Sequence, residues 1–386
     1  MSSPEAVRQI FENRDDSLCA STSRRKLLAI MPPQSLMYQS GDKKKSARKA
    51  VATAFGNTID HFDTQTLISD FAGSLKQGDD LPTELTTFCC RLASEFVTGR
   101  SNPGLEQHLE RSSEVLDQLS LIAMIFSWIR KLPRHHHVFT EFAEAQKQLI
   151  AEIESVQRKK SGTSTSFLNY LEHASEKEGI SREECRDNAT LFAMAIGFNL
   201  RVVLLNVFQQ LGHSERWQQE LRQASCGKSS REISSEKISR AVVKESLRLK
   251  PLVPLISRHV KSDTIIDGVR LKAGQMVFVS PWVSHFQSTS FKNPTVFDPG
   301  RFLGSERFEN CYLPFGGGSR HCVGTGWAIE TIGQIIAAIV DRFHLRDQSN
   351  TVQNSKNSHR MAAFNLIPVS TRIQLASLPR NRSADV

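Results

Sequence analysis

The chain has 386 residues, of which 39% are hydrophobic and 23% are charged. This composition is typical of a globular protein and excludes a fibrous or intrinsically disordered chain. The net charge of +9 comes partly from the basic runs at residues 43–45 and 158–160, but neither run is interleaved with aromatic residues, so we expect no nucleic-acid partner.

The cysteines and the apolar runs bear on where the protein works. Seven cysteines are scattered along the chain without a CxxC pair, which argues against a disulfide framework and against a zinc ribbon. No uninterrupted apolar run is expected to reach the roughly 20 residues of a bilayer span, and the first residues contain no signal-peptide core. We therefore expect a cytoplasmic protein without a membrane segment in the chain as given.

The first two thirds of the chain predict mostly helices. Residues 3–14 carry apolar side chains at helical spacing, and a second helical pattern covers residues 43–56 and ends at Gly56. The apolar run at residues 119–129 is broken by serines, which favours a buried helix. The three histidines at residues 135–137 follow Pro133 and are expected in an exposed loop, with a metal site as the alternative.

A long helix is predicted at residues 181–212. Ser181 and Glu184 have the spacing of a capping box, and Gly212 is a stop signal. The helix would be about 31 residues and roughly 46 Å long if unbroken. Because it is apolar on all sides beyond Ala189, we expect it to run through the middle of the domain, with any large ligand beside it.

The pattern changes after Pro251. The β-branched runs that follow are separated by Asp267-Gly268 and Ala273-Gly274, which predicts short antiparallel strands. Residues 290–311 read as an irregular meander, and a helix then runs to about Phe343 before a weak strand region. The whole chain, residues 1–386, is therefore predicted to be a single domain that is mainly helical with a small β region.

Four glycines surround one cysteine between the meander and the last helix. Glycine lets a backbone turn tightly or approach a bulky group, so Gly316, Gly317, Gly318 and Gly324 suggest a large flat ligand against the loop. Cys322 precedes a helix N-terminus, which favours a thiolate, the ligand that a haem iron can take. Zinc would need more ligands than His321 and Cys311 offer, and a phosphate loop would need a Gly-Lys-Ser/Thr ending.

Residues 315–324, FGGGSRHCVG, resemble the FxxGxRxCxG haem-thiolate signature of the cytochrome P450 superfamily. The specific positions are all present, and they are Phe315, Gly318, Arg320, Cys322 and Gly324. The resemblance implies a cytochrome P450-like fold with a long central I helix. It also implies heme b between that helix and the cysteine-loop helix, with Cys322 as the axial ligand of the iron.

Two further motifs appear in the order of that family. Residues 244–251, KESLRLKP, resemble the ExxR motif, and residues 297–302, FDPGRF, resemble the meander motif. Glu245 and Arg248 lie three residues apart and can pair on one helix face. The resemblance implies that Arg301 completes a structural Glu–Arg–Arg cluster behind the haem.

Four basic residues match the family's contacts to the haem propionates: Lys44, Arg48, Arg258 and Arg320. Lys44 stands where a histidine is usual, and the common tryptophan of the same helix is not evident. Two porphyrin carboxylates require partly buried cations, and arginine can hold a carboxylate with two hydrogen bonds.

The central helix departs from the family pattern. Monooxygenases of the family usually carry [Ala/Gly]-Gly-x-[Asp/Glu]-Thr, whose acid and alcohol relay protons to bound dioxygen. Here residues 196–200 read IGFNL, so that Gly197 remains while Asn199 replaces the acid and Leu200 replaces the alcohol. We expect Gly197 and Asn199 at the catalytic site.

Three functions stay open at this stage. The first is a monooxygenase acting on a lipid, terpenoid or steroid-like molecule, with a ferredoxin or flavoprotein as electron donor on the cysteine side. The second is a hydroperoxide-rearranging enzyme similar to allene oxide synthases or hydroperoxide lyases, which needs no reductase. The third is a catalytically degenerate haem protein. The substrate is expected against Ala193, Gly197, Asn199, Leu252, Val253 and Leu255.

The first helix also resembles the B helix of the family, which usual members reach only after an A helix and the first strands. About fifty residues of a usual member are then expected to be missing, on the scale of a sheet edge and one helix. Such a leader could have held a membrane anchor.

Overall fold

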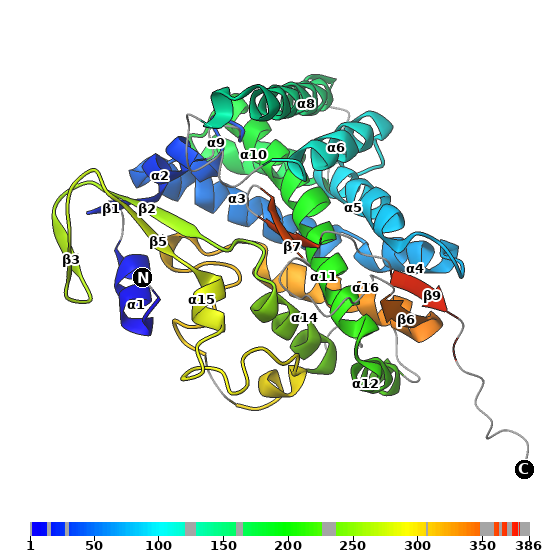
Figure 1. Cartoon of the computed structure of the whole chain (residues 1–386). Coiled ribbons are helices and arrows are strands. Elements are labelled where there is room, and N and C mark those ends of the chain that lie inside the picture. The colour runs from blue at the N-terminus through cyan, green and yellow to red at the C-terminus, as the bar shows by residue number, and fades with distance from the viewer. Residues whose placement is uncertain are drawn as a thin grey trace, which may run out of the picture.

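The computed structural model describes residues 2–13, 17–27, 31–119, 129–159, 165–225, 237–305 and 308–347, together with residues 359–362, 365–368, 373–376 and 378. The fold is mainly helical with small sheets, as predicted (Figure 1). The helices are α1 (Pro4–Glu12), α2 (Ala20–Leu27), α3 (Gly41–His61), α4 (Thr64–Ser74), α5 (Leu81–Thr98), α6 (Pro103–Leu116), α8 (Pro133–Lys159), α9 (Phe167–Glu178), α10 (Arg182–Met194), α11 (Arg201–Gly212), α12 (Glu215–Ser225), α14 (Lys237–Leu249), α15 (Pro281–His285) and α16 (Thr325–Arg342). Shorter helical segments are η1 (Leu36–Tyr38), η2 (Ile129–Lys131), η3 (Ala195–Leu200), η4 (Pro299–Phe302) and η5 (Gly318–Arg320).

The predicted central helix is continuous through α10, η3 and α11, and it crosses the molecule diagonally in Figure 1. Its capping box is present: the Glu184 N–H donates to Ser181 Oγ at 3.2 Å, and the Ser181 N–H donates to the Glu184 carboxylate at 2.7 Å. The middle segment, η3, is π-helical, which apolar periodicity did not indicate.

The same helix is the exception to the expected absence of a membrane-length segment. Among the described residues, the 31-residue helix Arg182–Gly212 is long and apolar enough to cross a bilayer by length and composition alone. In the fold, 72% of its most apolar window is buried inside the protein. It is therefore a core helix here, as its all-round apolar character predicted.

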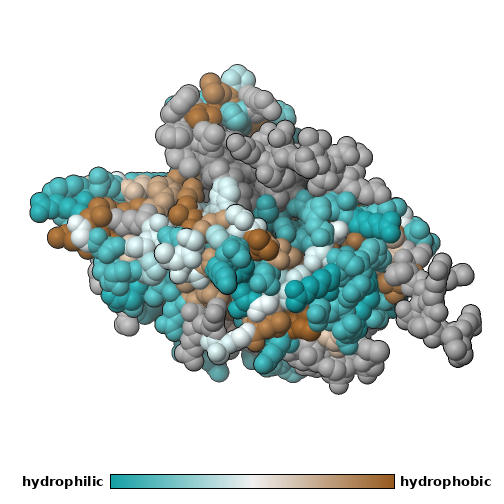
Figure 2. Space-filling model, turned by 60° about the horizontal axis from the view of Figure 1, so that its bottom comes forward, coloured by the Kyte–Doolittle hydropathy of each residue, from teal (hydrophilic) through white to brown (hydrophobic). Residues whose placement is uncertain are grey.

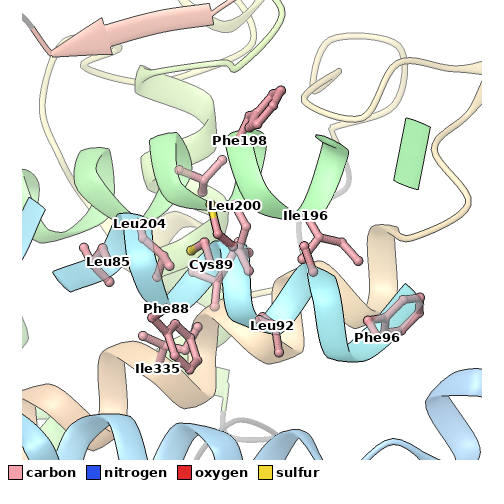
Figure 3. Packing of buried hydrophobic residues seen from close by; sticks show 14 of the residues in the cluster. Leu85, Phe88, Cys89, Leu92, Phe96, Ile196, Phe198, Leu200, Leu204 and Ile335 are labelled. Atoms are coloured by element: carbon pink, nitrogen blue, oxygen red, sulfur yellow. The ribbon is translucent and has the colours of Figure 1, made fainter. Parts of the chain in front are cut away.

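The core is built around this helix. Leu85, Phe88, Cys89, Leu92 and Phe96 of α5 are all buried, and Figure 3 shows them gathered with Ile196, Leu200 and Leu204 of the central helix and Ile335 of α16. Burying a side chain of this size contributes about 1.5–3 kcal/mol. This packing fixes the central helix relative to α16, the helix that follows the cysteine loop.

The sheets are small and antiparallel, as the pattern after Pro251 predicts. The strands are β1 (Leu18–Cys19), β2 (Ile256–Val260), β3 (Thr264–Ile266), β4 (Val269–Leu271), β5 (Met276–Val279), β6 (His344–Asp347), β7 (His359–Ala362), β8 (Asn365–Pro368) and β9 (Ile373–Ala376). Strand β2 lies between β1 and β5, and the other pairs are β3–β4, β6–β9 and β7–β8. Asp267 (φ 46°) and Gly268 (φ 74°) are both left-handed, which makes the tight β3–β4 turn.

Two local predictions were wrong, and one lies mostly outside the described residues. Helix α3 does not stop at Gly56 but continues to His61: a glycine inside a helix costs only about 1 kcal/mol, and the buried Thr58 beyond it donates its hydroxyl to the Ala54 carbonyl at 2.7 Å. The histidines 135–137 lie in the first turn of α8 rather than in a loop, since Pro133 suits the first helical position. Most of the helix expected at residues 119–129 falls at residues 120–128, outside the described part.

The surface that Figure 2 presents is largely hydrophilic, with apolar residues in small separate groups. Exposed large apolar side chains include Ile265 on the β3–β4 hairpin and Trp282 on α15. Scattered apolar side chains of this kind are ordinary on globular proteins.

Candidate functional site

The cysteine loop is a closed turn in front of α16. The Gly316 N–H donates to the Leu313 carbonyl and the Cys322 N–H donates to the Phe315 carbonyl, each at 3.1 Å. Helix α16 begins three residues after Cys322, at Thr325. These bonds place Cys322 and Phe315 in the wall of a cavity.

Three of the four loop glycines, Gly316, Gly317 and Gly324, line the cavity, and Gly317 and Gly318 lie against Phe11 of α1. A Cβ at Gly317 would overlap the ring of Phe11, and one at Gly318 would overlap the Phe11 carbonyl. Gly318 also has a left-handed φ of 61°, and it is absent from the described cavity wall. The close approach of α1 therefore explains Gly317 and Gly318. A Cβ at Gly324 would lie 3.3 Å from the Phe55 ring, and Gly324 does line the cavity.

The surroundings of Cys322 shift the pKa of its thiol in both directions. The helix N-terminus predicted to favour a thiolate is present: the Gly324 N–H lowers the pKa of the thiol, as do the Thr325 hydroxyl and the charge of Arg48. Desolvation by the surrounding atoms outweighs them and raises the pKa of Cys322 above its ordinary value. A coordinated metal ion removes such a proton outright, so the thiol fits a metal ligand.

The cavity has a volume of about 400 Å³ and lies between the central helix and the cysteine loop with α16. One wall is a face of the central helix, and the opposite wall contains the loop and the first turns of α16, including Trp327, Ala328 and Ile332. This is the arrangement that the sequence predicts for the haem. A cavity of this size with mostly apolar walls is typical of a small-molecule site.

All four predicted propionate residues lie in the cavity wall. Lys44 Nζ donates to Ser319 Oγ at 3.2 Å, and Arg48 donates to the His321 carbonyl at 2.8 Å.

The other two predicted cations are anchored in the same way. Arg258, on β2, is 5% exposed and donates to the Ser257 carbonyl at 2.9 Å. Arg320 donates to the Leu36 carbonyl at 3.1 Å and to the Gln39 carbonyl. The loop, α3 and β2 thus bring these cations together.

Sequence reasoning missed another cation of the cavity. Arg24, on α2, also lines it, and its guanidinium donates to the Met37 carbonyl at 3.4 Å. Nothing in the spacing around residues 20–27 indicates this role, because α2 reaches the cavity through its packing on β2. No acidic residue belongs to the described cavity wall. The wall therefore suits a ligand with more than one negative charge.

The Glu–Arg–Arg cluster is assembled and almost completely buried. The carboxylate of Glu245 accepts from Arg248 at 2.8 and 2.9 Å, from Arg301 Nε at 3.1 Å and from the Asp298 N–H at 2.9 Å. The Arg248 guanidinium also donates to the carbonyls of His285, Pro294 and Val296. The cluster therefore fixes the meander to α14.

Gly197 and Asn199, both predicted at the catalytic site, lie on different faces of the central helix. Asn199 lines the cavity, but a Cβ at Gly197 would point at Leu109, Ala93 and Cys90, and Gly197 is not in the described cavity wall. Among the expected substrate contacts, Leu252 and Val253 line the cavity, whereas Ala193 and Leu255 do not. The apolar residues of the central helix missed by the sequence include Phe192, Ala195 and Val203, of which Ala195 begins the π-helical segment.

The donor set limits the metal that the cavity can hold. Within the described ranges, no group of three or more histidine, cysteine, aspartate or glutamate side chains could hold a metal ion. A metal bound to Cys322 must therefore bring most of its ligands with it, as iron does in a porphyrin. The single sulfur, the cations and the apolar walls all fit a haem.

Comparisons with known proteins agree with this geometry. Residues 1–375 match the family model of cytochrome P450. Over 371 residues the chain is 27% identical to cyclooctat-9-en-7-ol 5-monooxygenase of Streptomyces melanosporofaciens, and the match covers 90% of this chain and 80% of that protein. It is also 27% identical over 235 residues to cytochrome P450 4F2 of Homo sapiens, a match that covers 56% of this chain and 45% of the relative.

The fold also resembles solved structures. Retinoic acid bound cyanobacterial CYP120A1 has a TM-score of 0.80 at 20% identity, with 97% of this chain and 87% of that chain covered. CYP175A1 from Thermus thermophilus has a TM-score of 0.75 at 21% identity, with 98% and 88% covered. At these identities the likeness shows the fold.

Proposed function

The chain belongs to the cytochrome P450 family, and we propose that it is a haem-thiolate monooxygenase that inserts one oxygen atom of O2 into a hydrophobic small molecule. The observation that carries the proposal is the position of Cys322. Its thiol faces a cavity of about 400 Å³ whose opposite wall is the central helix, and the loop beside it is ringed by Lys44, Arg48, Arg258 and Arg320.

Different residues of the cavity would bind different parts of heme b. Cys322 would bind the iron through its sulfur, and the four cations would neutralise the two carboxylates, with the arginines able to donate paired hydrogen bonds. When bound, the haem iron supplies the activation of O2, for which a donor must deliver electrons. The Glu245 cluster would keep the meander and the loop in place behind the group.

Proton delivery is the step in which this chain differs from usual members. Neither Asn199 nor Leu200 can act as an acid, because an amide does not titrate and leucine has no proton to donate. Asn199 can still donate and accept hydrogen bonds in the cavity. In our proposal it orders a water molecule or a substrate hydroxyl, which then passes the proton.

The named relatives support the monooxygenase over the alternatives. One relative is a monooxygenase whose name specifies an apolar ring alcohol, and a structural neighbour binds retinoic acid. A lipid, terpenoid or steroid-like substrate is consistent with the apolar walls. The hydroperoxide-rearranging enzyme is the second candidate, because Asn199 stands where the acid is expected. The ordinary length of the cysteine loop argues against it.

The proposal includes an electron donor on the cysteine side. Lys43 and Lys45 are exposed on α3, the helix that brings Lys44 and Arg48 to the cavity. Their charge would suit an acidic ferredoxin or flavoprotein.

Reductant dependence separates the two candidate functions. The holoprotein is incubated under ¹⁸O2 with cedrol, lauric acid or progesterone, with and without NADPH and a ferredoxin–ferredoxin reductase pair. A monooxygenase gives a product with one labelled oxygen only when the reductant is present. A parallel incubation with linoleic acid hydroperoxide contains no reductant. Rapid consumption of the hydroperoxide there, with no labelled product in the first set, contradicts the proposal.

A further inference from the structure

The wall that the central helix presents to the cavity is apolar at every position except one. The side chains of this wall are Leu191, Phe192, Ala195, Ile196, Asn199, Leu200 and Val203. Ile196, Leu200 and Val203 are buried, and Asn199 lies among them, half-buried in the π-helical segment. Any polar group of a substrate that approaches this wall therefore meets the Asn199 amide.

The other polar residues of the cavity belong to different elements. Arg24 comes from α2, Lys44 and Arg48 come from α3, Arg258 comes from β2, and Ser319, Arg320 and His321 come from the cysteine loop. Lys44 and Arg48 donate hydrogen bonds to the cysteine loop, to Ser319 Oγ and to the His321 carbonyl. The polarity of the cavity is thus divided between a cationic rim and a single amide on the helix.

The Asn199 amide has no protein partner within the described part of the chain. Asparagine in a helix often bonds the carbonyl one turn back, which Thr190 does through its hydroxyl to the Arg186 carbonyl. Asn199 makes no such bond, so both its N–H donors and its carbonyl acceptor are available to whatever fills the cavity. A pure hydrocarbon would remove water from this amide and return no hydrogen bond.

We propose that the substrate carries a hydroxyl or carbonyl oxygen that hydrogen-bonds to the Asn199 amide, so that it is an already oxygenated hydrophobic molecule and not a plain hydrocarbon. Asn199 is then a specificity-determining residue. The reaction that supplies such a substrate is an earlier oxygenation, a hydration, or a cyclisation that captures water. This inference rests on the proposed function only in that the same cavity receives the substrate.

Ligand binding to the holoprotein tests the inference without turnover. The probes are cyclohexane and cyclohexanol. Both are small enough to fit the cavity, so a difference between their affinities does not arise from size. Dissociation constants are measured by calorimetry and by the shift of the haem absorption band. The proteins are the wild type, Asn199→Leu and, as a matched control on the same wall, Val203→Leu. Asn199→Thr keeps a hydroxyl and serves as a second variant.

The quantity compared is the ratio of the cyclohexanol to the cyclohexane affinity. Cyclohexanol and cyclohexane differ in their free energy of transfer out of water. This difference is the same for every variant, so it cancels when the affinity ratios of two variants are compared. We expect Asn199→Leu to lower the ratio roughly threefold to tenfold, as for the loss of one hydrogen bond, and Asn199→Thr to lower it less. Val203→Leu should change both affinities alike.

An unchanged ratio in Asn199→Leu, or no binding of cyclohexanol at its solubility limit, overturns the inference. Its failure is distinguishable from failure of the proposed function. Reductant-dependent oxygenation together with an unchanged ratio refutes only the role of Asn199. Reductant-free consumption of a hydroperoxide, with no labelled product in the incubations that contain reductant, refutes the monooxygenase, whatever the ratio.

Discussion

Replacing Glu245 by glutamine should be far more damaging than the same replacement at Glu5. Both glutamates pair with an arginine three residues later, Glu245 with Arg248 and Glu5 with Arg8, and each pair has two short N···O contacts. They differ in burial: the Glu245 and Arg248 side chains are 0% exposed, whereas those of Glu5 and Arg8 are 47% and 44% exposed.

The size of the expected loss in stability follows from the hydrogen bonds that the Glu245 carboxylate accepts. Glu245 accepts four hydrogen bonds, two from Arg248, one from Arg301 and one from the Asp298 N–H. Removing its charge leaves two largely buried guanidinium groups uncompensated, which costs about 3–5 kcal/mol. That is a large part of the roughly 5–15 kcal/mol that stabilises a typical domain.

The assay is urea unfolding of the holoprotein, followed by circular dichroism and by the loss of haem absorbance. We expect the free energy of unfolding to fall by about 3–5 kcal/mol in Glu245→Gln. Glu5→Gln should leave it nearly unchanged, because water screens an exposed pair. Equal effects of the two substitutions would refute the reasoning that burial makes this cluster structural.

Three further predictions concern other parts of the site. In urea titrations, Gly318→Ala should lower the free energy of unfolding by more than Gly268→Ala does. Both glycines have a positive φ, but only at Gly318 would the added Cβ overlap a backbone atom of α1. Burial lowers the pKa of His285 to about 3 from an ordinary 6.5, so the unfolded chain binds a proton that the folded chain does not, and stability should fall as the pH drops from about 6.5 towards 3. His285→Gln should remove up to about 1.4 kcal/mol per pH unit of that slope, measured by denaturation at several pH values, and an unaltered slope would count against the assignment. Arg258→Leu should speed the transfer of haem to apomyoglobin, whereas Arg270→Leu on the exposed hairpin should not, and equal rates would exclude Arg258 as a propionate contact.

The parts of the fold that short sequence patterns specify were predicted well. The capping box at Ser181, the strands after Pro251 and the positions of Cys322 and α16 all depend on residues close together in the chain. Glu245 and Arg248 pair because a helix places residues three apart on one face. The position of the cavity, between the central helix and the cysteine loop, was predicted from the resemblance to the cytochrome P450 family and not from the residues alone.

The errors arise where distant segments meet. Gly317 and Gly318 make room for Phe11, more than 300 residues earlier, so the loop alone could not show what lies against it. The same holds for Arg24, which reaches the cavity through the packing of α2 on β2. The orientation of Gly197 depends on the π-helical segment, which adds a residue to a turn without any signal in the apolar pattern.

The bond between Cys322 and a haem iron is tested most directly by the carbon monoxide difference spectrum of the reduced protein. Wild-type protein expressed with ample haem precursor should show the thiolate-type band, as should Cys311→Ala, which removes a buried cysteine outside the cavity wall. Cys322→Ala should lose that band. A thiolate-type band that persists in Cys322→Ala, or a folded wild-type protein that binds no haem, would contradict the account.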